Sequence, residues 1–157
     1  MKPNIIIRKM EDNDLDKVIS IENSCYPFPW TKRIFSDCIK ANNICKICEI
    51  NGNIIGYLIM YVAVAEAHIL NVCVKKDMQG KGLGASLMDE AMENAVRLNA
   101  DTAFLEVRVS NAKAIELYSL YDFVEVGQRP NYYPAENGRE DAIVMAKHIS
   151  PMVFNGI

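Results

Sequence analysis

The pattern of apolar and polar residues divides this chain into segments of two different periods. Short runs rich in β-branched residues predict about seven strands, at residues 5–8, 44–50, 54–64, 66–74, 102–109, 123–128 and 142–147. Apolar residues spaced three or four positions apart predict about four helices: one capped by Asp12 or Asn13, one capped by Thr31, one over residues 83–98 and one over residues 111–120. A polar stretch, residues 131–141, is expected to be a loop between the last two strands.

The order of these elements predicts a mixed sheet covered by helices. Residues 51–53 (Asn-Gly-Asn) are typical of a tight hairpin, because Asn and Gly accept positive φ, and hairpins pair strands antiparallel. Strands 66–74 and 102–109 are joined through a helix, which favours a parallel pair. We therefore expect an α/β (α+β) protein with a mixed, mostly antiparallel, twisted sheet, forming a single domain over residues 1–157 with its core at about residues 5–148.

Composition and charge narrow the class of protein and its partners. Hydrophobic residues make up 50% of the chain and charged residues 24%, as in an ordinary globular domain. The net charge of −3 gives no reason to expect a nucleic-acid or membrane partner. The longest apolar stretch, residues 54–65, is interrupted by Gly56 and is too short to span a membrane. No secretory signal is visible and the five cysteines are odd in number, so we expect free thiols and a cytoplasmic location.

Cys45 and Cys48 have the spacing of a zinc knuckle, but the chain has no second such pair. The only histidines, His68 and His148, are far away in the sequence. In an extended strand, positions three apart face opposite sides, so the two thiols would not converge. We therefore expect core and surface thiols and no metal site.

The clearest chemical signal is a glycine-rich turn between an apolar strand and an amphipathic helix. The run 69–74 is followed by Gln79-Gly-Lys-Gly-Leu-Gly84. Glycine lets a ligand approach the main chain, and the unpaired N–H groups at a helix start attract anions, so the turn predicts a phosphorylated ligand. A Walker A loop is excluded, because no Ser or Thr follows Gly-Lys at the required spacing.

Two other interpretations of this turn stay open at this point. Residues 80–85 satisfy the loose Gly-x-Gly-x-x-Gly/Ala pattern of dinucleotide-binding folds, but the following strand ends at residues 109–111 without the acid that such a fold requires. The turn is also compatible with a helix start whose glycines only permit close packing.

Gln79, Gly82 and Gly84 also match the pyrophosphate-binding signature of the GNAT acetyltransferases. The match continues through Pro29-Trp30, Glu66-Ala67, Leu70-Asn71, residues 105–108, Ser110-Asn111, Ala114-Ile115, Leu117-Tyr118, Phe123, residues 131–134 and residues 138–142. Together these residues resemble the RimI-type ribosomal-protein-alanine N-acetyltransferases of that family, over about residues 5–148. The resemblance implies the GNAT fold and an acetyl-CoA-dependent enzyme without a metal. It also implies the substrate, the N-terminal alanine of a small-subunit ribosomal protein, whose amine attacks the thioester directly.

Several residues acquire a role in cofactor binding from this resemblance. The backbone of Val72, Cys73 and Val74 would pair with the pantetheine arm, and a bulge there would turn an N–H toward the thioester oxygen. Asn111, at a helix start, would bind the cofactor or serve as an N-cap. The glycine turn would hold the pyrophosphate through Gln79, Gly80, Lys81, Gly82, Leu83, Gly84 and Ala85.

Glu106 and Tyr118 match the proton acceptor and the proton donor of the family. On its strand Glu106 shares a face with Phe104 and Arg108, and a carboxylate beside Phe104 in a central strand is expected to have a raised pKa. The alternative is a solvated or Arg108-paired glutamate. Tyr118 would protonate the departing thiolate, and the alternative is a tyrosine that only covers the core. An acyl-enzyme on Cys73 is disfavoured, because no histidine is placed to activate the thiol.

The expected loop before the last strand is the candidate peptide-binding element. Its aromatic and charged side chains suit an extended peptide: Tyr132, Tyr133, Glu136 and Arg139. The alternative is an ordered turn built on Pro134 and Gly138.

The chain departs from the family at Tyr121-Asp122, where the family usually has Leu-Gly. That glycine supplies a left-handed helix stop, which Asp can adopt at some cost, and the placement of Tyr118 depends on it. Three rival functions stay open: a GNAT enzyme for another amine (a small metabolite, an antibiotic or a lysine side chain), a silent CoA-binding module, and a nucleotide-dependent oxidoreductase. The missing acid and the hairpins disfavour the last.

Overall fold

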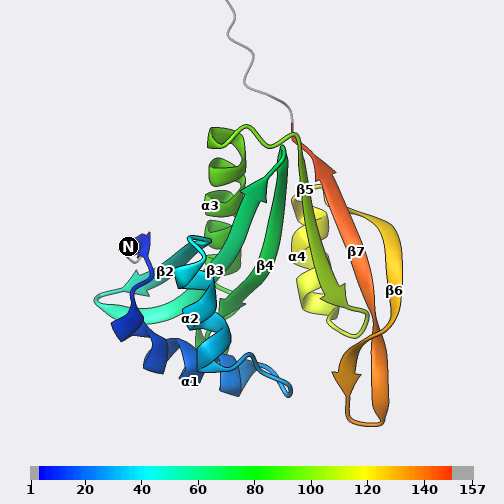
Figure 1. Ribbon diagram of the computed structural model, residues 1–157. Helices are drawn as coiled ribbons and strands as arrows, with labels where there is room; N and C mark the ends of the chain where they lie inside the picture. The colour runs from blue at the N-terminus through cyan, green and yellow to red at the C-terminus, as the bar shows by residue number, and fades with distance from the viewer. Residues whose placement is uncertain (1–3, 150–157) are drawn as a thin grey trace, which may run out of the picture. The chain divides into compact units, whose positions relative to one another are not determined.

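The computed structural model describes residues 4–149, which form a seven-stranded mixed sheet with four α-helices (Figure 1). The elements are β1 (Ile5–Lys9), η1 (Asp12–Asp14), α1 (Leu15–Cys25), α2 (Lys32–Lys40), β2 (Ile44–Ile50), β3 (Asn53–Ala63), β4 (Glu66–Val74), η2 (Lys76–Met78), α3 (Leu83–Arg97), β5 (Thr102–Arg108), α4 (Ala112–Leu120), β6 (Val124–Ala135) and β7 (Gly138–His148). The strand order is β1-β2-β3-β4-β5-β7-β6. β4 and β5 pair in parallel, whereas β1–β2, β2–β3, β5–β7 and β6–β7 are antiparallel. The expected mixed, mostly antiparallel sheet is confirmed.

The described chain forms two compact units. The first comprises the residues up to Met60 together with Leu70–Met88, and the second comprises Tyr61–Ile69 and the residues from Asp89 onward. β3, β4 and α3 each run through both units, so neither unit is one continuous segment of the sequence. The expected single domain over residues 1–157 stays a prediction.

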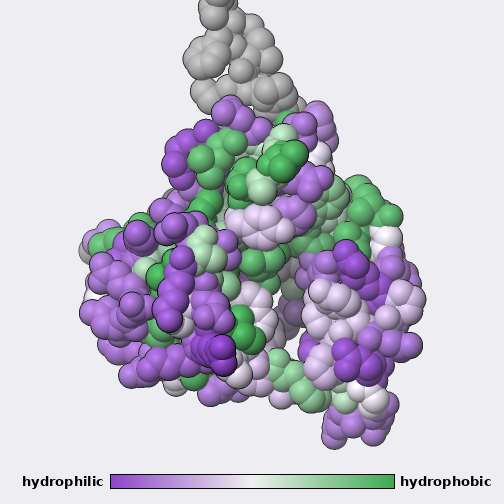
Figure 2. Space-filling model, in the orientation of Figure 1, coloured by the Kyte–Doolittle hydropathy of each residue, from purple (hydrophilic) through white to green (hydrophobic). Residues whose placement is uncertain are grey.

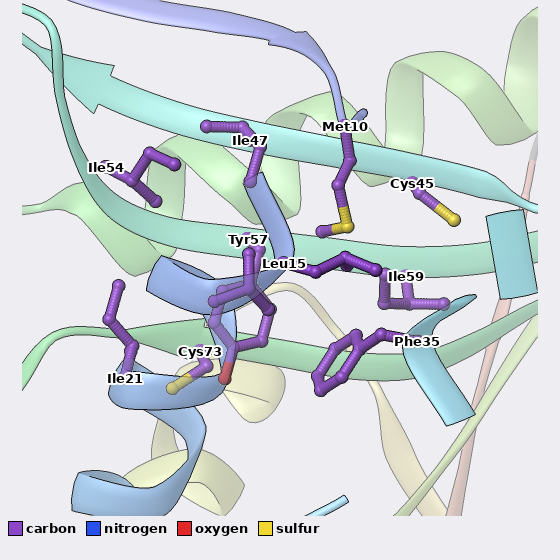
Figure 3. Close-up of a cluster of buried hydrophobic side chains, with 11 residues drawn as sticks. Met10, Leu15, Ile21, Phe35, Cys45, Ile47, Ile54, Tyr57, Ile59 and Cys73 are labelled. Atoms are coloured by element: carbon purple, nitrogen blue, oxygen red, sulfur yellow. The ribbon is translucent and has the colours of Figure 1, made fainter. Parts of the chain in front are cut away.

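In the first unit, α1 and α2 pack against one face of β2, β3 and β4. Their cluster of buried side chains is drawn in Figure 3 and includes Leu15, Ile21, Phe35, Cys45, Ile47, Ile54, Tyr57, Ile59 and Cys73. Gly56 precedes Tyr57 on β3 and faces the other side of the sheet, toward α3. A Cβ there would lie 3.3 Å from the Leu87 side chain and 2.6 Å from the carbonyl oxygen of Cys73, so only glycine lets β3, β4 and α3 approach this closely.

In the second unit, β5 has one buried face and one half-buried face. Its buried residues are Ala103, Leu105 and Val107, and the half-buried residues of the other face are Phe104, Glu106 and Arg108. The predicted alternation is confirmed. It keeps the carboxylate of Glu106 out of the apolar core while anchoring its backbone in the interior of the sheet.

Two local predictions are confirmed in the first unit. Asn51 and Gly52 both have positive φ, 52° and 79°, as the tight hairpin between β2 and β3 requires. Thr31 caps α2, because its side-chain oxygen accepts a hydrogen bond from the Ile34 N–H at 3.3 Å.

The predicted cap of the first helix is wrong. Asp12 and Asn13 lie within the 3-10 turn η1, and α1 begins only at Leu15. Glu11 and Asp14 instead form a capping box at the start of η1, in which the Asp14 carboxylate accepts the Glu11 N–H at 2.8 Å. Arg8 on β1 also binds this carboxylate, a contact that the local helix pattern does not indicate.

The predicted loop at residues 131–141 is also wrong. β6 continues to Ala135 and β7 begins at Gly138, so only two residues join the strands. The register shifts between Arg129 and Tyr133, and Asn131 has a φ of 53°, so a bulge absorbs these residues within the ladder. β6 lies at the edge of the sheet, where the missing N–H groups of proline are tolerated and most side chains are exposed, so apolar alternation is absent.

Candidate active site

The end of β4 presents two carbonyl groups on the same edge. Backbone polar groups alternate between the two edges of a strand, so Val72 and Val74 point one way and Cys73 the other. The Val72 carbonyl accepts a hydrogen bond from the Tyr26 hydroxyl at 3.2 Å. The Val74 carbonyl accepts one from the Gln79 side-chain amide at 2.9 Å. Side chains therefore already order this edge, and the expected bulge within residues 72–74 stays a prediction.

The glycine turn has the backbone that an anion site needs. Gly80 and Gly82 have φ values of 79° and 81°, and no atom lies within 4 Å of where their Cβ atoms would be. α3 starts directly afterwards, at Leu83, with its N-terminal N–H groups. The turn is thus open to a ligand and left-handed at both glycines, which together favour an anion at the helix start. The Gln79 side chain closes this turn against β4.

Glu106 is held by two partners from β6 in the second unit. Arg129 places its Nε 3.0 Å from Oε1 of Glu106, and the Tyr132 side chain interacts electrostatically with the same carboxylate. That interaction with Glu106 raises the pKa of Tyr132 above its ordinary value, because the carboxylate would repel an ionised tyrosine. The Glu106 carboxylate thus favours the neutral form of Tyr132, whose hydroxyl can donate a hydrogen bond.

The alternative pairing of Glu106 with Arg108 is wrong. Arg108 donates to Oε1 of Glu140 on β7 at 2.8 Å and to the Pro134 carbonyl at 2.7 Å. Its guanidinium also lies 4.6 Å from the centre of the Tyr133 ring. Arg129 is the residue that pairs with Glu106. This pairing could not be predicted from the sequence, because no local pattern in β6 indicates which side chain reaches across to β5.

Tyr118 is buried near the end of α4, with 9% of its surface exposed. Its ring lies 6.3 Å from that of Phe123. Asp122 has a φ of 67°, and the N–H of Phe123 bonds the Tyr118 carbonyl at 3.1 Å. This is the helix stop that a glycine usually supplies, so Asp122 adopts the expected left-handed conformation. The departure from the family pattern therefore leaves the end of α4 intact around Tyr118.

Asn111 is the N-cap of α4, as one of its two expected roles required. Its Oδ1 accepts a hydrogen bond from the Ala114 N–H at 3.3 Å. The cap uses only this oxygen, so the Nδ2 hydrogens can donate to a ligand at the same time. The two expected roles of Asn111 are therefore compatible, and its contact with a cofactor stays a prediction.

Of the candidate peptide-binding residues, Tyr132, Tyr133 and Arg139 lie on the strands of the β6–β7 hairpin, and Glu136 lies in its turn. The tip of this hairpin is hydrophilic on the side shown in Figure 2. The rings of Tyr132 and Tyr133 meet edge to face, with centroids 4.9 Å apart. Burial and the nearby Glu106 raise the pKa of Tyr133 to about 12. Arg139 donates to the carbonyls of Asn131 and Tyr132, both at 2.8 Å, so its guanidinium holds the bulge that presents the two rings.

All five cysteines are free, as expected: Cys45, Cys48 and Cys73 are buried, and Cys25 and Cys38 are partly buried. Burial raises the pKa of Cys45 and of Cys48 to about 11, and it raises the pKa of Cys73 even further above the ordinary value. A buried thiol of this kind is a poor nucleophile, which adds to the case against an acyl-enzyme on Cys73. Within residues 4–149, no group of three or more His, Cys, Asp or Glu side chains could hold a metal ion.

The predicted site residues divide between the two units. The β4 edge and the glycine turn, over residues 72–85, belong to the first unit. The second unit contains Glu106, Asn111, Tyr118, Tyr132, Tyr133 and Arg139. Within the second unit the structure brings Glu106 together with Tyr132. Among the described residues, no helix is long and apolar enough to cross a membrane.

Comparison with known proteins gives consistent matches over nearly the whole chain. Residues 15–123 match the acetyltransferase (GNAT) family. The [ribosomal protein bS18]-alanine N-acetyltransferase of Escherichia coli K12 is 37% identical over 144 residues, which cover 92% of this chain and 97% of that protein. A putative enzyme of the same name from Bacillus subtilis is 35% identical over 147 residues, covering 92% and 96%.

A solved structure extends the similarity to three dimensions. The crystal structure of the ribosomal-protein-S18-alanine N-acetyltransferase from Escherichia coli superposes with a TM-score of 0.88 at 35% identity. The alignment covers 98% of this chain and 99% of that one. The hairpin that the sequence pattern failed to predict thus lies within a fold shared over almost the full length of both proteins.

Proposed function

The chain belongs to the GNAT acetyltransferase family and is an acyltransferase, and we propose that it transfers the acetyl group of acetyl-CoA to the N-terminal alanine of a bS18-type ribosomal protein. The observation that supports this substrate is the 37% identity to an enzyme named for it, over 92% of this chain and 97% of that protein. A bS18-type N-terminal peptide is then the partner. The cytoplasm, where such a protein is made, is the proposed location.

Acetyl-CoA is proposed to bind along β4 and over the glycine turn. The backbone of residues 72–74 would face the pantetheine arm, and residues 79–85 would hold the pyrophosphate. Open space at the Cβ positions of Gly80 and Gly82 supports this proposal, because it lets an anion reach the N–H groups at the start of α3. The Nδ2 of Asn111 would donate to the same ligand.

Glu106 and Tyr118 are proposed to move the two protons of the reaction. An α-amino group has a pKa of about 7.7–8.0, so a useful fraction is neutral near pH 7 and only one proton must be removed as the amine attacks. Glu106 would take that proton, in an orientation set by Arg129 and Tyr132. Tyr118 would give its proton to the thiolate as the carbon–sulfur bond breaks. Positioning of the amine against the thioester would supply much of the acceleration.

The hairpin of β6 and β7 is proposed to bind the substrate peptide through Tyr132 and Tyr133. Arg139 supports this surface indirectly, because it fixes the backbone of the bulge that carries both rings. The two units would act as one domain, since β3, β4 and α3 belong to both.

The test is acetyl transfer from labelled acetyl-CoA to short peptides that begin with Ala, Ser, Met or Gly, beside free polyamines. We expect the alanine peptide to be acetylated fastest. An otherwise identical peptide with a blocked α-amine should accept no label, which serves as the control for lysine acetylation. Activity confined to polyamines or to the blocked peptide would refute the protein N-terminus as substrate.

A further inference from the structure

A buried carboxylate lies at the end of α1, outside the residues assigned above. Glu22 is only 2% exposed and has three donors. Its Oε1 accepts the Tyr57 hydroxyl at 2.6 Å and the Asn71 amide at 3.0 Å, and its Oε2 accepts the Trp30 N–H at 2.9 Å. One side chain therefore joins α1, β3 and β4 to Trp30, near the end of the α1–α2 connection.

The segment between α1 and α2, residues 26–30, is held at both ends, and Glu22 supplies one of the two contacts. At its start, the Tyr26 hydroxyl donates to the Val72 carbonyl on β4. At its end, the Trp30 backbone is tied to Glu22, and the Trp30 ring lies 5.2 Å from that of Phe35. All of these contacts lie within the first unit. The contact between Tyr26 and β4 thus depends on the conformation of a segment whose other end is fixed by Glu22.

Stability alone does not explain a charge in this place. Burying a carboxylate is costly, and well-packed apolar residues of similar volume are often at least as stabilising as a buried ionic network. What the carboxylate adds is directionality, since its two oxygens fix three donors from three different parts of the unit. Directional control is useful where a segment must stay in register with a reacting group.

We infer that Glu22 is a positioning residue for acetyl transfer, which holds Tyr26 against the edge of β4 where the acceptor amine must approach. The inference rests on the proposed function, in which residues 72–74 bind the pantetheine arm. A loosened segment would then disturb the approach of the peptide more than the binding of acetyl-CoA. Glu22 itself is almost fully buried, so it would act through the segment and not by contact with either substrate.

The decisive variant is Glu22→Gln, which keeps the size of the side chain. An amide can accept at only one of the two oxygen positions, so it either opposes the Trp30 N–H with a donor or forces Tyr57 and Asn71 to reorient. We expect the KM for an N-terminal alanine peptide to rise about tenfold, as the loss of one buried charged hydrogen bond predicts, with an unchanged KM for acetyl-CoA. Because Trp30 is the only tryptophan, its emission should also shift to the red.

A matched control is available at the other end of the same helix. Asp14→Asn also converts a partly buried carboxylate to an amide, but its partners are Arg8 and the Glu11 N–H. This control should lower the melting temperature with no change in peptide KM or in Trp30 emission. Tyr26→Phe removes the hydroxyl that donates to the Val72 carbonyl, so it tests the same contact should Glu22→Gln fail to fold, and we expect a smaller rise in peptide KM.

The outcomes separate this inference from the proposed function. If the wild type acetylates the alanine peptide but Glu22→Gln and Tyr26→Phe both keep its peptide KM, the positioning role is overturned. An equal rise in peptide KM for Asp14→Asn would overturn it too, because a general loss of stability would then suffice. If the wild type does not use the peptide, the proposed function fails. Independently of that result, unchanged Trp30 emission in Glu22→Gln would refute the claim that Glu22 fixes the segment between α1 and α2.

Discussion

At the residue scale, the sequence identified the candidate proton acceptor but not the partners that orient it. Glu106 could be found because the resemblance to the acetyltransferase family places the proton acceptor there, on the face of β5 that alternation separates from the buried one. Its contact with Arg129 could not, because that contact depends on the pairing of β5, β7 and β6 and on a bulge within β6. Long-range ion pairs follow from register, which no local pattern encodes.

Glu106→Gln tests the proton acceptor. Because Gln cannot take a proton from the amine, we expect kcat to fall by about 100-fold or more near neutral pH, with little change in the dissociation constant of acetyl-CoA. Glu140→Gln is the matched control, since Glu140 is a second acid of the same sheet that pairs with an arginine. Full activity of Glu106→Gln would exclude its role as base.

Asp14→Asn also has a defined effect on stability as a function of pH. Arg8 holds the pKa of Asp14 below its ordinary value of 3.8. A carboxylate with a lowered folded pKa contributes stability above its unfolded pKa and loses it as the pH falls through the folded one. We expect the variant to lose about 1 kcal/mol of unfolding free energy at pH 7. Urea unfolding should show this difference shrinking below pH 3.8, and a constant difference across that range would contradict the assignment.

At the element scale, strands with a buried face were predicted closely and the edge hairpin was not. β2 and β4 have the predicted bounds, because apolar side chains mark each of them. β6 has few buried positions, and Pro130, Asn131 and Pro134 resemble loop residues. Their place in a strand is determined by β7, through the bulge and the hydrogen bonds of Arg139. The same residues that obscured the strand thereby present the tyrosine rings.

Gly82→Val tests the glycine turn. A β-branched residue at a φ of 81° is strongly strained and places methyl groups in the space proposed for the pyrophosphate, so we expect acetyl-CoA binding to be lost in a calorimetric titration. Gly127→Val is the control, because Gly127 lies in a strand with open space at its Cβ position and no positive φ. Equal affinity of the Gly82 variant and the wild type for acetyl-CoA would refute the proposed pyrophosphate site at the glycine turn.

At the scale of the whole molecule, the mixed, mostly antiparallel sheet and the family were within reach of the sequence, whereas the strand order and the division into two compact units were not. The units are assembled from alternating stretches of chain, so no shift in composition marks them. We predict that they unfold together, because β3, β4 and α3 run through both. Trp30 emission reports on the first unit, and far-ultraviolet circular dichroism reports on all helices. Coincident denaturation curves are expected, and two separated transitions would contradict a single domain.

The most direct test of the proposed function uses a full-length bS18-type ribosomal protein as substrate. The protein is incubated with acetyl-CoA and either the wild-type enzyme or Glu106→Gln, and mass spectrometry of the digested product locates the acetyl group. We predict acetylation at the α-amine of the N-terminal alanine by the wild type and a greatly reduced amount with the variant. An unmodified N-terminus, or acetylation confined to lysine side chains, would contradict the proposed function.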